Sequence, residues 1–168
     1  MQILVPVEVT ESLVSELKRA GKKETGGLLF GEHIGGETFK IVGITIQAKR
    51  GTETEFMRDP GQHGAQLDEF FQRTGNDCER YNYFGEWHSH PTFAPVPSST
   101  DLRTLKTIVE DTTVGVNFLV LVIVRLVGGD SLALSATAYG GNEVYETATV
   151  FMELRATVLK TRRRVRAL

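Results

Sequence analysis

The chain has 168 residues, of which 40% are hydrophobic and 24% are charged, a composition that is typical of a soluble globular protein and excludes intrinsic disorder. This length favours one domain, large enough to bury its core without a stabilising metal or disulfide. The single cysteine, Cys78, excludes a disulfide scaffold and a CxxC zinc knuckle. The first residues form neither a basic leader nor a long apolar run, so we expect a cytoplasmic protein that does not cross a membrane.

Charge is distributed unevenly along the chain. The net charge is −2, but residues 155–168 hold six basic side chains and no acidic one, which leaves 13 basic against 21 acidic side chains in residues 1–154. We expect residues 1–154 to form the domain and residues 155–168 to be a basic tail or a helix end. A short basic terminus is more often solvated or frayed than a nucleic-acid contact, so we expect no nucleic-acid partner.

The N-terminal part predicts a strand, a helix and a hairpin. Apolar residues predict a strand over 3–7, and Thr10 is a suitable N-cap for an amphipathic helix that ends at Ala20, before a glycine that supplies a left-handed stop. The segments 26–33 and 37–47 flank an Ile-Gly-Gly turn, and the second is rich in β-branched residues. These two segments therefore predict a β-hairpin.

A second helix and a strand with polar residues come next. The Asp59-Pro60 pair is typical of a helix start, an apolar face follows it, and Gly75 marks the helix end. Residues 81–90 alternate as a strand does, whereas residues 91–97 contain three prolines and cannot pair regularly in a sheet. We therefore expect the strand to lead into a loop.

The C-terminal part contains the most apolar segment. Residues 117–124, NFLVLVIV, predict a central strand that is buried on both faces. The other expected elements are a helix that begins near Ser98 to Asp101, strands over 131–139 and 143–150, and a C-terminal helix with Phe151, Leu154 and Val158 on one face. Together the elements predict a single-domain α/β (α+β) fold, in which a mixed β-sheet is flanked by helices.

The segment from Gly85 to Asp101, GEWHSHPTFAPVPSSTD, carries candidate metal ligands. Alternation along a strand places His88 and His90 on one face, with their Cα atoms about 7 Å apart. Neutral imidazoles are good zinc ligands, and a catalytic zinc site has three protein ligands and a bound water. Asp101 is a candidate third ligand if the proline-rich loop returns it to the histidines. Glu86, on the same strand face, is a competing candidate.

Each of these residues also has a structural explanation. A His-x-His pair in a strand is commonly a polar edge rather than a ligand pair, and Ser98-x-x-Asp101 before an apolar helix matches a capping box. Exposed glutamate is the norm, so Glu24 alone would be interpreted as a solvated carboxylate. For the remaining candidates we expect surface positions for His33 and His63, a structural role for Cys78 and a core position for Trp87.

Three strings of residues together resemble the motif of the JAMM (MPN+, or JAB-domain) zinc metallopeptidases: Glu24-Thr25-Gly26-Gly27, His88-Ser89-His90-Pro91 and Ser98-x-x-Asp101. That motif is an upstream Glu, then His-x-His-Pro, a short spacer and Ser-x-x-Asp, and every chemical position is matched. The lack of long insertions resembles the compact prokaryotic branch. The resemblance implies the JAB/MPN fold, with layering similar to that of cytidine deaminases.

The resemblance also implies a role for each matched residue. His88, His90 and Asp101 would bind one Zn²⁺, which also holds a water molecule. Glu24 would be the general base and then the general acid, and Ser98 would donate to the oxyanion. These roles agree with the chemistry of zinc, which lowers the pKa of bound water from about 15.7 towards 7. A nearby glutamate can then carry the proton to the leaving amine, and a hydroxyl can stabilise the tetrahedral oxygen.

Family members of this kind cleave after the C-terminal Gly-Gly of ubiquitin-like or sulfur-carrier proteins, so the resemblance implies a peptidase or isopeptidase with such a tail as its substrate. We prefer an antiphage operon with ubiquitin-like conjugation enzymes to sulfur-carrier processing, because the chain is longer than the smallest members and has a basic tail. The alternatives are a non-catalytic MPN-type scaffold and a zinc nucleobase deaminase, whose cysteine signature is absent. We expect a monomer or a homodimer.

Overall fold

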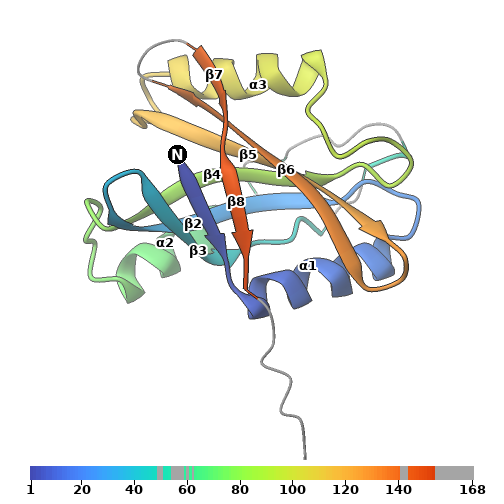
Figure 1. Cartoon of the computed structure of the whole chain (residues 1–168). Coiled ribbons are helices and arrows are strands. Elements are labelled where there is room, and N and C mark those ends of the chain that lie inside the picture. Colours follow the sequence, from blue (N-terminus) through green and yellow to red (C-terminus); the bar gives the residue numbers. More distant parts are fainter. Residues whose placement is uncertain (49–50, 54–58, 60, 62, 141–143, 154–168) are drawn as a thin grey trace, which may run out of the picture.

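The computed structural model describes residues 1–153 except 49–50, 54–58, 60, 62 and 141–143. Within them, one sheet of eight strands is covered by helices (Figure 1). The strands are β1 (Gln2–Val5), β2 (Gly26–Gly35), β3 (Thr38–Ile44), β4 (Tyr81–Ser89), β5 (Phe118–Val127), β6 (Ser131–Gly140), β7 (Val144–Thr147) and β8 (Thr149–Met152). The helices are α1 (Val7–Ala20), α2 (Gly64–Arg73) and α3 (Ser99–Glu110). No helix in the described part of the chain is both long and apolar enough to cross a membrane.

The sheet mixes parallel and antiparallel pairs, as the sequence predicts. Its order is β7-β6-β5-β4-β2-β3-β1-β8. β4 pairs in parallel with β5, and β1 pairs in parallel with both β3 and β8, whereas the other neighbours are antiparallel. The predicted hairpin is confirmed as the β2–β3 pair.

The sheet curls until its two edges nearly meet. β7 and β8 lie at opposite ends of the strand order, yet only Ala148 separates them in the sequence, and Figure 1 shows them as one long ribbon that crosses the sheet. The amide of Ala148 donates to the carbonyl of Ala136 in β6 at 3.0 Å. The result is an almost closed, barrel-like sheet, which does not confirm the expected cytidine-deaminase-like layering.

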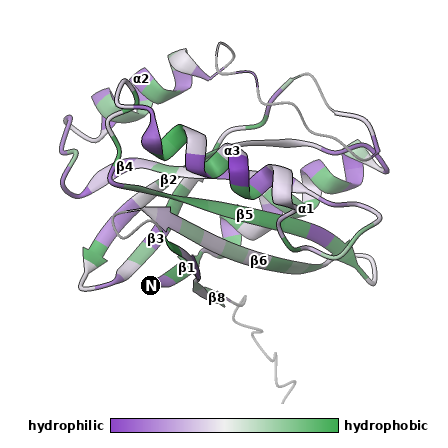
Figure 2. Cartoon of the chain, turned by 90° about the horizontal axis from the view of Figure 1, so that it is seen from above, coloured by the Kyte–Doolittle hydropathy of each residue, from purple (hydrophilic) through white to green (hydrophobic). Residues whose placement is uncertain are grey.

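Strand β5 is buried on both faces, as predicted. Its residues from Leu119 to Val124 are all less than 5% exposed, and Figure 2 shows most of the strand as hydrophobic. Val120, Val122 and Val124 pack with α1, whereas Leu119, Leu121 and Ile123 pack with α3. α2 lies on the α3 side of the sheet, where Phe70 stacks on Phe30 of β2 with ring centroids 4.4 Å apart. The two faces can therefore be named the α1 face and the α3 face.

Two helices begin elsewhere than predicted. α1 begins directly after Pro6, whose carbonyl accepts the amide of Thr10 at 3.0 Å, so Thr10 lies inside the first turns and is not the N-cap. α2 begins at Gly64 rather than at Asp59, because the Asp59 carboxylate accepts the amide of Gly61 at 3.1 Å in a local turn. Pro60, which with Asp59 was predicted to start this helix, lies outside the described residues.

The predicted C-terminal helix is wrong where it can be checked. The predicted strand over 143–150 is divided at Ala148 into β7 and β8, and Phe151 lies in β8 opposite Leu4 of β1. The long-range pairing with β1 satisfies backbone groups that a helix would have satisfied internally. The other expected positions, Leu154, Val158 and the basic segment 155–168, lie outside the described residues.

Candidate metal centre

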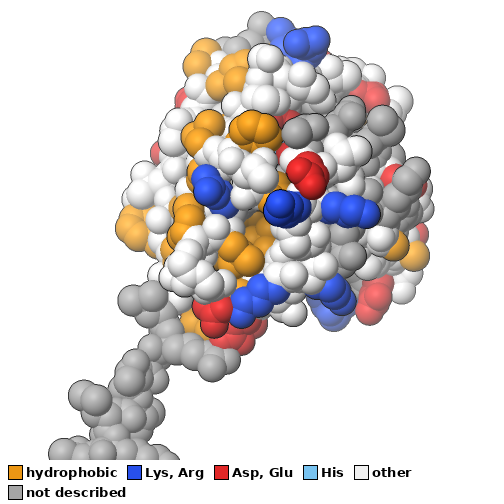
Figure 3. All heavy atoms as spheres, turned by 90° about the vertical axis from the view of Figure 1, so that its right-hand side faces the viewer, with side chains coloured by type: hydrophobic (Ala, Val, Ile, Leu, Met, Phe, Trp, Pro, Cys, Tyr) orange, Lys and Arg blue, Asp and Glu red, His pale blue; other side chains and the backbone are white. Residues whose placement is uncertain are grey.

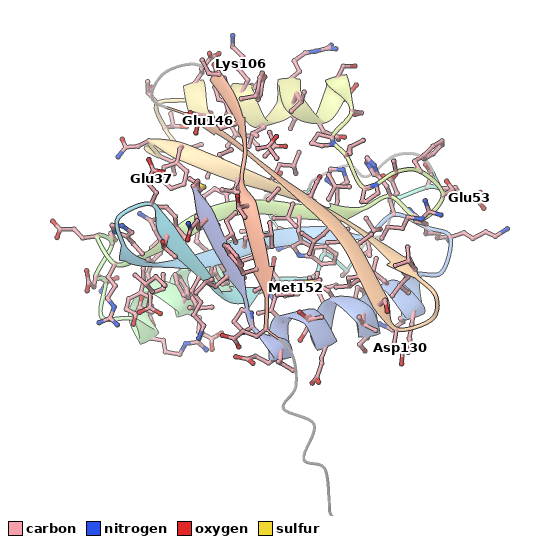
Figure 4. The ribbon with its side chains drawn as sticks, viewed as in Figure 1. Glu37, Glu53, Lys106, Asp130, Glu146 and Met152 are labelled. Carbon is pink, nitrogen blue, oxygen red and sulfur yellow. The ribbon has the colours of Figure 1, made fainter. Side chains whose placement is uncertain are left out.

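The candidate ligands gather where β4 ends in the middle of the sheet. His88 pairs with Ile123 of β5 and so lies on the α3 face. The pairing with β5 continues beyond the strand, because the amide of His90 donates to the carbonyl of Val124 at 3.0 Å. Figure 3 views this side of the molecule, where basic side chains gather beside hydrophobic ones. In Figure 4, Glu53 lies on this side and Glu37 lies towards the opposite end of the sheet.

Three ligand atoms converge at this end. His88 Nε2 lies 3.2 Å from His90 Nε2 and 3.3 Å from Asp101 Oδ1, and His90 Nε2 lies 3.7 Å from Asp101 Oδ2. Both histidines are buried, and the Asp101 side chain is 18% exposed. Within the described part of the chain, this is the only group of three or more His, Cys, Asp or Glu side chains that could hold a metal ion.

The spacing of these atoms suits a tetrahedral ion. With zinc–ligand bonds of about 2.0 Å, two corners of a tetrahedron lie about 3.3 Å apart. The three observed separations, 3.2, 3.3 and 3.7 Å, are close to that edge length. Two imidazole nitrogens and a carboxylate are a donor set that zinc accepts. No further His, Cys, Asp or Glu of the described residues joins the group, so the donors that are present fit an open three-ligand site.

The loop after β4 orients one of the rings. His90 Nδ1 lies 3.2 Å from the carbonyl oxygen of Ala94, so that nitrogen donates and leaves Nε2 as the free lone pair. Arg125 Nη1 donates to the neighbouring carbonyl of Phe93 at 3.1 Å. The loop therefore holds the tautomer of His90 in which Nε2 can bind a metal. Its outer surface exposes Phe93 and Val96, which are 54% and 55% exposed.

The local environment favours an ionised Asp101 and a neutral His90. Burial raises the pKa of Asp101, but the hydrogen bond and positive charge of His88, with hydrogen bonds from Ser98, outweigh it and hold that pKa well below its ordinary value. Burial lowers the pKa of His90, as does the neighbouring His88, and together they outweigh the hydrogen bond to Ala94. An ionised carboxylate and a neutral imidazole are the forms that ligate zinc.

Ser98 and Asp101 form a capping box at the start of α3. The Asp101 amide donates to Ser98 Oγ at 3.2 Å, and the Ser98 amide donates to Asp101 Oδ2 at 2.6 Å. The structural explanation of this motif is therefore confirmed, yet it does not compete with metal binding. The cap holds one oxygen of Asp101, while the other lies 3.3 Å from His88 Nε2. The helix start fixes the carboxylate that the site uses.

Glu24 is buried beside this cluster, with 3% exposure, so the interpretation as a solvated carboxylate is wrong. Its amide donates to the carbonyl of Thr52, and its own carbonyl accepts the amide of Gly51. The next residue, Thr25, is bonded through its backbone to Ser89, which separates the two histidines. Alternation from that pair places Glu24 on the face that also carries His88 and His90.

A family model described as prokaryotic homologs of the JAB domain matches residues 6–136, which include all five motif residues. The chain belongs to this family. A protein from Enterobacter hormaechei subsp. hoffmannii (strain UCI 50), named CD-NTase/cGAS isopeptidase, is 33% identical over an alignment of 110 residues that covers 63% of this chain and 57% of that protein. The chain thus spans little more than half of the length of this relative.

A solved structure shares the fold of this JAB domain. It is the solution structure of a structural-genomics target protein from Desulfitobacterium hafniense, with a TM-score of 0.65 and 18% sequence identity. The match covers 90% of this chain and 92% of the other. At this identity the likeness concerns the fold alone.

Other candidate residues of the JAB domain fall away from the cluster. Glu86 is not part of it, and its carboxylate accepts the hydroxyl of Tyr83 at 3.2 Å. His33 is exposed and Trp87 is fully buried, as predicted. The expected surface position of His63 is wrong: this residue is only 2% exposed, and its Nδ1 lies 2.9 Å from Thr45 Oγ1. Cys78, for which we expect a structural role, is exposed.

Sequence reasoning missed three buried polar residues near the site, which are Glu16, Thr25 and Ser89. A signal for Glu16 was available. The predicted helix has an apolar stripe at Leu13, Leu17 and Ala20, and residue 16 falls within that stripe at helical spacing. A glutamate in an apolar stripe indicates a buried carboxylate with a specific partner.

Proposed function

We propose that this JAB domain is a zinc-dependent peptidase or isopeptidase, which hydrolyses the bond after the C-terminal Gly-Gly of a ubiquitin-like protein. The observation that carries the proposal is the convergence of His88 Nε2, His90 Nε2 and the Asp101 carboxylate at separations close to a tetrahedral edge. The JAB family match and the relative named as an isopeptidase support the class of reaction.

Each residue of the motif has one task in this reaction. His88, His90 and Asp101 would hold the ion, and bound zinc supplies the Lewis acidity that lowers the pKa of water and polarises a carbonyl. Glu24 takes a proton from the attacking water and returns it to the departing amine, so it needs no bond to the metal. Its place on the strand face that also carries both histidines supports this role.

Ser98 stabilises the charge that develops on the scissile carbonyl oxygen. Its oxygen accepts the Asp101 amide, which leaves the hydroxyl proton available for donation to a substrate. A donor of this kind acts mainly in the transition state, where the oxygen becomes negative. The capping box supports the role, because it fixes the Ser98 side chain before substrate arrives.

We infer that the substrate is a ubiquitin-like protein joined through its C-terminal glycine to an amine of another protein. The relative's name couples isopeptidase activity with CD-NTase/cGAS proteins, which supports a CD-NTase conjugate in an antiphage setting over sulfur-carrier processing. A Gly-Gly tail has no side chains, so it can fit a narrow approach to a buried metal. The exposed Phe93 and Val96, on the loop between His90 and Asp101, offer apolar contact area for the body of the ubiquitin-like protein.

The test uses the full chain. Zinc content is measured on purified protein, and a panel of ubiquitin-like proteins is joined through the terminal glycine either to a reporter chain or to a lysine side chain. Mass spectrometry of the products identifies the bond that is cut. The expected result is about one zinc per chain and a product that ends in Gly-Gly. Zinc binding without cleavage of any panel member would favour the non-catalytic scaffold, and absence of zinc would overturn the proposal itself.

Glu24→Gln tests the general base, with Glu86→Gln as the matched control. Both glutamates lie near the histidines on the α3 face, but only Glu24 is assigned to proton transfer. Loss of a general base typically reduces rate by about 10²- to 10⁴-fold. We expect that loss in Glu24→Gln with zinc retained, and near-normal activity in Glu86→Gln. Equal activities in the two variants would remove Glu24 from the mechanism.

A further inference from the structure

A set of buried polar groups lies directly behind the candidate metal centre. Thr25 and Ser89 are 0% exposed and Glu16 is 1% exposed. Thr25 Oγ1 donates to Glu16 Oε1 at 2.9 Å, the Thr25 amide donates to Ser89 Oγ at 3.0 Å, and the Ser89 amide donates to the Thr25 carbonyl at 2.9 Å. We call Glu16, Thr25 and Ser89 the rear brace.

The rear brace lies on the opposite face of the sheet from the motif residues. Successive side chains of an extended chain point to opposite faces. Ser89 separates His88 from His90, and Thr25 follows Glu24 directly. The neighbouring Trp87 packs in the core beneath α1, and Glu16 comes from α1 itself. The brace therefore joins, from behind, the two backbone segments whose front faces carry Glu24 and the histidines.

Burying the polar groups of the rear brace costs free energy, and packing of the core alone does not require them. A carboxylate buried in an apolar stripe loses its hydration, and only specific hydrogen bonds compensate for that loss. Glu16 obtains them from the Thr25 hydroxyl and from Arg19, whose Nε donates to Oε2 at 2.9 Å. An apolar side chain at residue 16 would complete the stripe of α1 without this cost. What the carboxylate adds is a fixed position for Thr25.

We propose that Glu16, Thr25 and Ser89 are positioning residues that fix Glu24 against His88 and His90. The inference rests on the proposed function, because it assigns the brace to the geometry of the same site. Thr25 is held at its backbone by Ser89 and at its side chain by Glu16, so the residue before it cannot shift relative to the end of β4. A displacement of about 1 Å in a proton-transfer group is enough to reduce the rate of the reaction strongly.

The test compares Thr25→Val with Thr25→Ser in the whole 168-residue chain. Valine keeps the shape of threonine and removes the hydroxyl that bonds Glu16, whereas serine restores it. The control is Thr74→Val, which removes a threonine hydroxyl bonded to the Phe70 carbonyl at 2.9 Å, at the end of α2. Glu16→Leu is the second variant, because an apolar side chain completes the stripe of α1 and removes the acceptor of the Thr25 hydroxyl.

Three measurements separate positioning from stability and from the proposed function. The first is amide hydrogen exchange at Thr25 and Ser89 in metal-free protein. The second is the zinc dissociation constant, and the third is kcat and KM on a Gly-Gly fusion. For Thr25→Val we expect folded protein, exchange about tenfold faster at residues 25 and 89, and zinc affinity within about threefold of wild type. We also expect kcat to be lower by at least about tenfold with KM unchanged, and Thr25→Ser and Thr74→Val to behave as wild type.

The outcomes decide whether the rear brace positions the site or only stabilises the fold. A Thr25→Val protein with wild-type kcat and zinc bound would overturn the positioning role. That role is also overturned if Thr25→Val loses stability and zinc while Glu16→Leu, which lacks the acceptor for Thr25, keeps full kcat, since the brace would then be structural only. If wild-type protein binds no zinc, the proposed function fails. The exchange rates at residues 25 and 89 would still show whether the Thr25 hydroxyl holds the two segments together.

Discussion

Gly27 lies so close to Thr45 that a Cβ on the glycine would come within 2.1 Å of the Thr45 carbonyl oxygen. That oxygen belongs to the backbone and already accepts the indole N–H of Trp87 at 2.9 Å. It therefore cannot move away without breaking a buried hydrogen bond. The close approach explains why the second glycine of the Glu24-Thr25-Gly26-Gly27 string has no side chain.

We expect Gly27→Ala to destabilise the protein by about 2 to 3 kcal/mol, the cost of forcing an extra methyl group into a packed position. Gly64→Ala is the control, because Gly64 begins α2 with nothing within 4 Å of an added Cβ. We expect that control to be neutral or slightly stabilising, since alanine is the better helix former. Urea unfolding monitored by Trp87 fluorescence measures both, and equal unfolding free energies for the two variants would contradict the prediction.

Asp101→Asn separates the metal ligand from the helix cap. An asparagine oxygen can still accept the Ser98 amide, so the cap should survive, but the negative charge that favours a cation is lost. We expect the zinc affinity to fall by at least about 100-fold, since even changes outside the ligand shell cost about 10- to 100-fold. Competition with a chromophoric chelator measures it. An unchanged dissociation constant would exclude Asp101 as a ligand.

Ser98→Ala should affect both stability and catalysis while leaving zinc in place. Loss of the Ser98 oxygen removes the acceptor of the Asp101 amide and should cost about 1 kcal/mol of folding stability. Loss of the proposed oxyanion donor should reduce kcat by about 10²- to 10³-fold. Zinc content, urea unfolding and cleavage of a Gly-Gly fusion are measured on one preparation. Normal kcat with reduced stability would limit Ser98 to capping.

The metal-free protein should lose stability in acid through Asp101. Burial raises the pKa of this carboxyl, but His88 and then Ser98 outweigh burial and hold the pKa in the folded protein below its ordinary value of 3.8. Its contribution is therefore complete well above pH 3.8 and is lost as the pH falls towards the folded pKa. We expect the unfolding free energies of wild type and Asp101→Asn to converge on acidification from about pH 6 to about pH 2.5. Parallel curves would show that the carboxylate contributes nothing.

Local patterns in the sequence predicted the elements whose structure is set by residues close to them in the chain. The apolar run of β5, the hairpin of β2 and β3 and the loop of three prolines follow from propensity and turn chemistry within a few residues. The predicted strand over 143–150 includes the first half of β8, but its continuation through residues 151–152 could not be predicted in this way. Its partner is β1, at the other end of the domain, and helical spacing at Phe151 was outweighed by that distant pairing.

The candidate metal ligands could be identified because β4 and the start of α3 are close in sequence. The resemblance to the JAMM motif favoured Asp101 over Glu86 as the third member of the group, whereas alternation along β4 alone left both open. The burial of His63 could not be predicted, since it depends on Thr45, which is 18 positions away and reaches it only when the sheet has formed.

The pairing of β8 with β1 also bears on how the protein is made on the ribosome. β1 is synthesised first but is flanked by β3 and by β8, whose last residue is Met152. One edge of β1 therefore stays unpaired until almost the whole domain has emerged from the ribosome. Pairing between strands that are far apart in the sequence makes folding slow compared with that of chains built from local contacts. A nascent chain stopped before residue 149 should therefore expose the unpaired edge of β1, which is prone to aggregation and which we expect chaperones to bind.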